Sequence, residues 1–172
     1  MINLYTITVP QFIKHLGGLK NILTKAEAYA KEKGMSEEAF LNDAIIADMF
    51  PLKRQVQLAS DHAKGAAARL SGKENPKMED IEATFAELQT RIDKTIAFLE
   101  TFKEEDFKDA PIRQVMLPYF PGKYLTGEDF AVQYAVPNFF FHATTAYDLV
   151  RKNGVQIGKG DYMNDLPFHD VQ

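Results

Sequence analysis

Two histidines lie in the middle of segments with helical periodicity, where an imidazole can bind a metal ion or accept a proton. His62 belongs to residues 52–70 and His142 to residues 137–152. With a rotation of about 100° per residue, His62 lies about 80° from the centre of its apolar stripe, alongside Gln55. We therefore expect both imidazoles at the edge of an apolar core.

Other polar side chains share these helix faces. Asn138 and His142 are four residues apart, so their side chains lie one above the other on a helix, and Thr145 follows on the same edge. Sites in helical bundles are commonly built between facing helices. One interpretation is therefore a site with His62 and His142 as metal ligands and a pocket lined by Asn138, His15, Gln55 and Thr145.

The other interpretation of the two histidines is structural. Imidazole rings in proteins are commonly only partly buried and can bond the backbone or tyrosine and asparagine side chains. His15 lies near the apolar face of its own helix, and Asn138 directly follows Pro137, where an asparagine can cap a helix. On this interpretation the polar residues stabilise the bundle and form no site.

Several kinds of chemistry are excluded by what the sequence lacks. It contains no cysteine, so disulfides, thiolate nucleophiles and cysteine zinc sites are absent. It has no His-Glu-x-x-His, Gly-x-Ser-x-Gly or dinucleotide-binding signature. Its net charge is −4, its pI is about 5.6, and its lysines alternate with acidic residues, so no basic stripe is available for nucleic acid or a membrane surface.

Four segments repeat apolar residues at helical spacing, and we predict long helices over residues 10–33, 52–70, 78–102 and 137–152. The third has the most regular period and predicts a core face formed by Ile81, Phe85, Leu88, Ile92, Ile96, Leu99 and Phe102. The second is rich in alanine, with Gly65 beside its apolar face, which would let another helix approach closely. The pattern predicts an all-α fold, an antiparallel four-helix bundle.

The connections between these segments carry weaker signals. Residues 106–136 form a long crossover before the last helix, and residues 113–117 and 123–126 within it are candidate strands of a small hairpin over one end of the bundle. Residues 155–172 show no helical period and are expected to wrap the bundle surface.

A length of 172 residues fits one domain over residues 1–172. The sequence shows no long apolar run and no secretory signal at its start. Together with the absence of cysteine, this predicts a soluble, cytoplasmic protein.

The order of these features resembles the DinB/YfiT-like superfamily of metalloenzymes: a helix, a helix with one central histidine, a helix, a crossover, and a helix with a histidine motif. Within it the chain is similar to an uncharacterised bacterial family, a likeness that covers nearly the whole sequence. The likeness is carried by residues 48–52 (DMFPL), 61–66 (DHAKGA) and 137–142 (PNFFFH).

The resemblance implies a metal site with one departure. In the superfamily, three histidines commonly bind zinc or nickel, one from the second helix and two from the fourth. Carried over, the ligands fall on His62 and His142, but the remaining position is occupied by Asn138. A neutral amide oxygen is a poor ligand for zinc or nickel, so the resemblance implies a degenerate metal site.

Three functions remain open at this point. The first is binding of a small molecule at an inter-helix pocket with a degenerate metal site and no assignable reaction. The second, implied by the resemblance, is a zinc- or nickel-dependent thiol transferase or hydrolase-like enzyme. The third is a non-catalytic dimeric interaction protein, because homodimers are frequent in the superfamily and the fourth helix carries consecutive aromatic residues. Whether the protein is an enzyme stays open.

Overall fold

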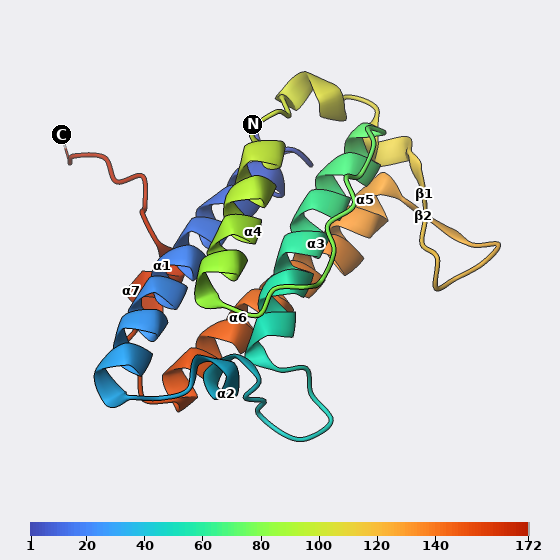
Figure 1. Cartoon of the computed structure of the whole chain (residues 1–172). Coiled ribbons are helices and arrows are strands. Elements are labelled where there is room, and N and C mark those ends of the chain that lie inside the picture. The colour runs from blue at the N-terminus through green and yellow to red at the C-terminus, as the bar shows by residue number, and fades with distance from the viewer. Residues whose placement is uncertain (172) are drawn as a thin grey trace.

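The four long helices of the computed structural model, which describes residues 1–171, are α1 (Val9–Lys33), α3 (Leu52–Ser71), α4 (Phe85–Leu99) and α6 (Val136–Lys152). They pack side by side as a bundle (Figure 1). α1 is antiparallel to α4, and α3 is antiparallel to α6, the helix with which it has its most extensive contact. The predicted all-α bundle is confirmed.

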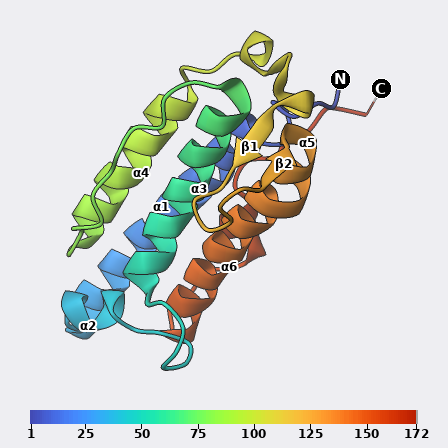
Figure 2. The ribbon, with the colours of Figure 1, turned by 90° about the vertical axis from the view of Figure 1, so that its right-hand side faces the viewer.

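α3 and α4 run in the same direction because residues 72–84 return along the whole bundle before α4 begins (Figure 2). At one end of the bundle, the carboxylate of Glu37 accepts a hydrogen bond of 2.6 Å from the backbone N–H of Phe85, the first residue of α4. At the other end, the ring of Phe102 lies against Phe107 and the backbone of Phe102 accepts a hydrogen bond from Tyr5. Residues 72–84, which connect the end of α3 to the start of α4, are called the strap below.

The predicted start of the third long helix at Met78 is wrong. α4 begins at Phe85, and Ile81, expected in its core face, is 77% exposed. The reason is a capping box, in which Thr84 accepts from the N–H of Glu87 and the Glu87 carboxylate accepts from the N–H of Thr84. This motif satisfies free N–H groups at a helix start and fixes the boundary.

Residues 100–135 form the crossover that leads to α6. Two 3-10 turns, η1 (Glu104–Phe107) and η2 (Ala110–Ile112), precede a hairpin of β1 (Gln114–Met116) and β2 (Tyr124–Thr126). The strands pair antiparallel, with Val115 opposite Leu125, and project from one end of the bundle, as Figure 1 shows. The predicted hairpin is confirmed.

After the hairpin, the chain passes through one turn of helix, α5 (Gly127–Asp129), and a π-helical turn, η3 (Phe130–Ala135), directly into α6. Gly127 is required here, because a Cβ at this position would lie 1.8 Å from the backbone oxygen of Ala110. π-helical turns are rare, and those that occur are frequently found at functional sites. The end of α6 that follows η3 is therefore a candidate position for a functional site.

The remaining elements are short. α2 (Glu37–Leu41) connects α1 to α3, and α7 (Lys159–Met163) lies along α1, as expected for a tail that wraps the surface. Gly18 permits this contact, since a Cβ there would lie 3.0 Å from the backbone oxygen of Asp161. The last predicted residue of the tail, position 172, lies outside the described residues.

The hydrophobic core runs through all four long helices and continues beneath the hairpin. Its largest fully buried side chains include Phe12, Phe40, Phe85, Phe130, Phe139, Leu16 and Leu70. Among residues 1–171, no helix has the length and apolar character needed to cross a membrane.

Candidate functional site

The structure brings His62 of α3 and His142 of α6 together. Their rings are nearly parallel, with 14° between the planes and 5.2 Å between the centroids. The side chains meet because α3 and α6 pack against each other along their lengths. Two residues that are 80 positions apart in the sequence thus form one pair between two helices.

Gln55 fixes the orientation of His142. Its side-chain nitrogen Nε2 donates to the backbone oxygen of Phe50 at 2.9 Å, and its Oε1 lies 2.7 Å from Nδ1 of His142. Because an amide oxygen only accepts, Nδ1 of His142 carries the proton and donates it. The other ring nitrogen, Nε2, therefore keeps its lone pair in the neutral imidazole.

Both histidines are uncharged at neutral pH. Burial lowers the pKa of His142 to about 4, and the charges of His62 and Arg54 act in the same direction. Burial likewise lowers the pKa of His62 to about 4, with a smaller contribution from the positive charge of Arg69. The pair can accept protons and hydrogen bonds, and it brings no charge of its own to a ligand.

Asn138 and Thr145 lie on the same face of α6 as His142, but their side chains bond their own helix. Nδ2 of Asn138 donates to the backbone oxygen of Tyr134 at 2.6 Å, and Oγ1 of Thr145 donates to the backbone oxygen of Phe141 at 2.7 Å. Asn138 does not cap α6, because η3 runs into that helix without a break.

His15 does not join this pair, so the prediction that it lines the same pocket is wrong. Its Nδ1 bonds the backbone oxygen of Gln11 at 2.8 Å, and its ring packs against Phe140 and Tyr162. Phe140 is two residues before His142, which places the two side chains on nearly opposite sides of α6. The apolar face of α1 at His15 therefore meets the far side of α6.

The donor set does not fit the three-histidine metal centre that the resemblance implies. Among the described residues, no group of three or more histidine, cysteine, aspartate or glutamate side chains is placed to hold a metal ion. Catalytic zinc sites use three protein ligands, and here two imidazoles stand beside an amide that is bonded to Tyr134.

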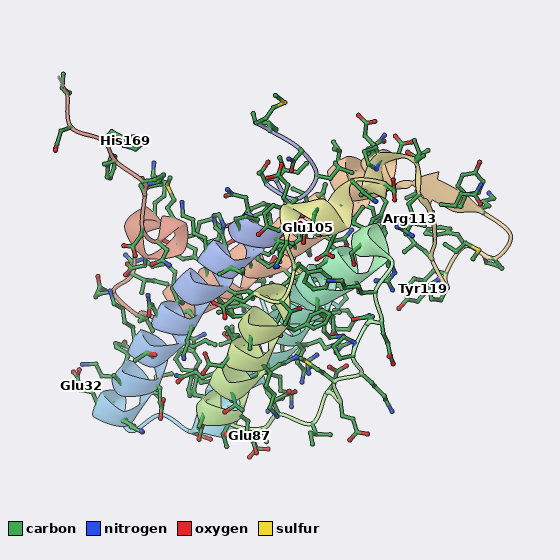
Figure 3. The ribbon with its side chains drawn as sticks, turned by 90° about the horizontal axis from the view of Figure 1, so that it is seen from above. Glu32, Glu87, Glu105, Arg113, Tyr119 and His169 are labelled. Carbon is green, nitrogen blue, oxygen red and sulfur yellow. The ribbon has the colours of Figure 1, made fainter. Side chains whose placement is uncertain are left out.

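A cleft of about 410 Å³ opens beside His62. Its walls come from α3, from residues 75–78 of the strap, from the hairpin and from η3. Tyr119 reaches from the hairpin toward this side of the bundle (Figure 3). Tyr134 of η3 completes the wall next to the histidines, with its ring centroid 6.0 Å from that of His62.

The strap that borders the cleft is held by ion pairs to one buried arginine, Arg91, which the sequence alone did not reveal. The side chain of Arg91 is 1% exposed, and its guanidinium binds three carboxylates at 2.9–3.0 Å, those of Asp61, Asp80 and Glu82. Asp61 belongs to α3, whereas Asp80 and Glu82 belong to the strap. The sequence did indicate that Arg91 lies near the core face of its helix, because it directly precedes Ile92 and follows Leu88 at helical spacing. It could not identify the three carboxylates, because they are distant from Arg91 in the sequence.

The chain is thus an all-α bundle with a small hairpin before its last helix and a pair of histidines between α3 and α6. Residues 4–163 match the family described as "Domain of unknown function (DUF1993)". This chain belongs to that family. It is similar to the crystal structure of a DinB family member protein from Shewanella denitrificans, with 45% identity and a TM-score of 0.94, over 99% of this chain and 100% of the other. A comparison with curated proteins gives no match.

Proposed function

We propose that this protein binds a small molecule in the cleft beside His62, with the two imidazoles as uncharged polar groups and without a catalytic metal. The observation that carries the proposal is that His62 lies between the cleft and His142, whose orientation Gln55 fixes. A volume of about 410 Å³ lies within the usual range of small-molecule pockets.

The environment of the pair supports this role. Neutral imidazoles both donate and accept hydrogen bonds, which suits recognition of a polar group on a ligand. His142 is buried and its ring stacks on that of His62, which restricts the movement of both side chains. Little conformational entropy therefore has to be lost when a ligand binds.

The rival function is a metal-dependent enzyme, and one observation favours it. Metal-bound histidines usually donate their second ring N–H to an oxygen, as Nδ1 of His142 does to Gln55. The number of ligands opposes it, because the residue in the third position is Asn138 and its Nδ2 donates to Tyr134. We therefore prefer a binding cleft over a metal centre.

A screen of a small-molecule library by NMR tests the proposal. Binding is followed through the ring resonances of His62 and the backbone resonances of α3 and the hairpin. We expect bound compounds that perturb the cleft and whose Kd increases at least about tenfold in His62→Ala, the cost of one or more lost hydrogen bonds.

The matched control is His169→Ala, which removes an exposed histidine from the C-terminal segment far from the cleft (Figure 3). It is expected to leave each Kd unchanged. Compounds that bind elsewhere on the bundle only, or that bind His62→Ala as tightly as the wild type, would contradict the proposal.

A further inference from the structure

The walls of the cleft beside His62 differ in chemistry. One side carries four positively charged side chains and a single carboxylate, that of Asp61; the cations are Arg54, Lys64, Arg69 and Lys77. The apolar and aromatic lining comes mainly from the hairpin and η3, with Leu117, Tyr119, Phe130 and Tyr134, together with Leu58 of α3. A ligand that fills the cleft therefore meets positive charge from α3 and the strap and apolar surface from the hairpin and η3.

Three of the four cations already have carboxylate partners. Arg54 pairs with Asp80 across to the strap. Lys64 lies 3.2 Å from the carboxylate of Asp61. The remaining pair is an exposed one, Lys77 with Glu79 at 3.7 Å. The charges of Arg54 and Lys64 are offset within the protein, and the charge of the exposed Lys77 is screened by water.

Arg69 differs from the other three cations. Among residues 1–171 its guanidinium has no carboxylate within ion-pair distance and forms no hydrogen bond, although the side chain is half-buried. The only carboxylate that lines the cleft is that of Asp61, and it is held by Arg91 and Lys64. A half-buried cation without a partner attracts an anion more strongly than a fully exposed one, because less water screens its charge.

Gly65 gives Arg69 its place on the helix. A Cβ at Gly65 would lie 2.5 Å from Nη1 of Arg69, so the guanidinium rests against bare backbone one turn before its own Cα. This direction brings the charge toward His62, three residues before Gly65. Glycine in the middle of a helix is unfavourable relative to alanine. At position 65, the absence of a side chain leaves room for the guanidinium of Arg69.

Asn75 of the strap lies at the same point. Its Nδ2 is 3.6 Å from the position of a Cβ on Gly65, and its Oδ1 accepts a hydrogen bond from Lys64 at 3.4 Å. The amide N–H groups of Asn75 and the N–H groups of Arg69 are therefore neighbouring donors at one end of the cleft. Arginine with its planar fork of donors matches the oxygens of a carboxylate or phosphate.

The apolar side of the cleft continues beneath the hairpin. Leu117 and Tyr134 line both this cleft and a second hollow of about 340 Å³. The second hollow is also bordered by Val115, Phe120, Tyr124 and Leu125, and its polar lining residues are Lys123 and Gln133. An apolar body that begins beside Tyr134 thus has further apolar surface along which to extend.

We propose that the ligand of the cleft is an amphipathic oxyanion, a small molecule with a carboxylate or phosphate bound by Arg69 and an apolar or aromatic body against Leu117 and Tyr134. This inference rests on the proposed function, since it specifies the ligand of the same cleft. An anion at Arg69 also offsets the positive charge that acts on His62, so binding raises the pKa of that histidine.

Isothermal titration with four probes tests the inference: benzoate, phenyl phosphate, and their neutral counterparts benzamide and phenol. Benzoate and phenyl phosphate separate the two sources of oxyanion. We expect at least one anionic probe to bind at least about tenfold more tightly than both neutral probes, the size of a charge-assisted hydrogen-bond pair. The pKa of the His62 ring, followed by NMR, is expected to rise in the complex.

Two variants separate charge from position. Arg69→Gln removes the charge, and Gly65→Ala displaces the guanidinium while the net charge and the helix are retained. Both are expected to weaken the anionic probe at least about tenfold and to leave the neutral probes unchanged. Lys77→Gln is the control, since it removes an equal charge from the rim of the same cleft and is expected to change anion binding less than about twofold.

The outcomes distinguish this inference from the proposed function. If neutral probes bind the cleft as tightly as the anions, the proposed small-molecule site stands, but the inference that its ligand is an oxyanion is wrong. Anion binding that Lys77→Gln weakens as much as Arg69→Gln also overturns it, because the effect is then one of general charge. Failure of all four probes to perturb the cleft overturns the oxyanion, while the library screen against His62→Ala still decides the proposed function.

Discussion

Acidification should destabilise this protein already below pH 6.5, where histidines begin to titrate before ordinary carboxylates do. The pKa of His142 falls from 6.5 to about 4 on folding, and burial is the main cause. Between these two values the unfolded chain binds a proton that the folded chain does not, so stability is fully present above pH 6.5 and is lost as the pH falls toward 4.

The magnitude follows from the width of that window. Each pH unit corresponds to about 1.4 kcal/mol, so the loss for His142, which is 8% exposed, approaches about 3 kcal/mol by pH 4. His62 adds a loss in the same direction, since its pKa is also lowered to about 4. A loss of this size is a large part of the stability of an ordinary domain.

The assay is urea unfolding at intervals from pH 7.5 to pH 4.5, followed by circular dichroism. We expect the free energy of unfolding to fall steadily below pH 6.5, and the fall to be about halved in His142→Gln. The matched control is His169→Gln, in the exposed C-terminal segment, which is expected to keep the wild-type slope. A free energy of unfolding that stays level from pH 7 to pH 5 would refute the buried, uncharged pair.

Three further predictions concern single features. Gln55→Leu should lower the free energy of unfolding by about 1–3 kcal/mol, because it leaves Nδ1 of His142 without an acceptor and the backbone oxygen of Phe50 without its donor, and chemical denaturation of the variant beside the wild type measures this. Arg91→Met should lower it by about 2–3 kcal/mol, since Asp61, Asp80 and Glu82 lose the buried guanidinium that joins α4 to α3 and the strap, whereas Lys94→Met on the exposed face of α4 should change it by less than about 0.5 kcal/mol. The homodimer expected from the family resemblance should appear at twice the monomer mass in light scattering; a monomer at every concentration would contradict that expectation.

The sequence was sufficient to predict the four long helices of this fold, but the predicted start of one of them was wrong. Apolar periodicity located the four long helices because each must bury one face. It placed the start of α4 too early, because Ile81 lies four residues before Phe85 and so matches the helical period, although it belongs to the exposed strap. The capping box at Thr84 and Glu87 was readable in the sequence and was a stronger signal of the boundary.

The site could be predicted in part. Helix geometry placed His62 and Gln55 on one face of α3, and the structure joins them to His142. The same reasoning failed for His15, because a helical face does not reveal which side of which neighbour it meets. The partners of Arg91 and the placement of Arg69 over Gly65 depend on contacts and side-chain directions that sequence spacing does not encode.

Metal analysis of the purified, untagged protein tests the central claim that the histidine pair serves a binding cleft and not a metal centre. After incubation with zinc or nickel and removal of free metal, we predict far less than one ion per chain in the wild type. Asn138→His is predicted to gain about one ion per chain, since it supplies a third imidazole on the face of α6 that carries His142. One ion per wild-type chain, lost in both His62→Ala and His142→Ala, would contradict the account.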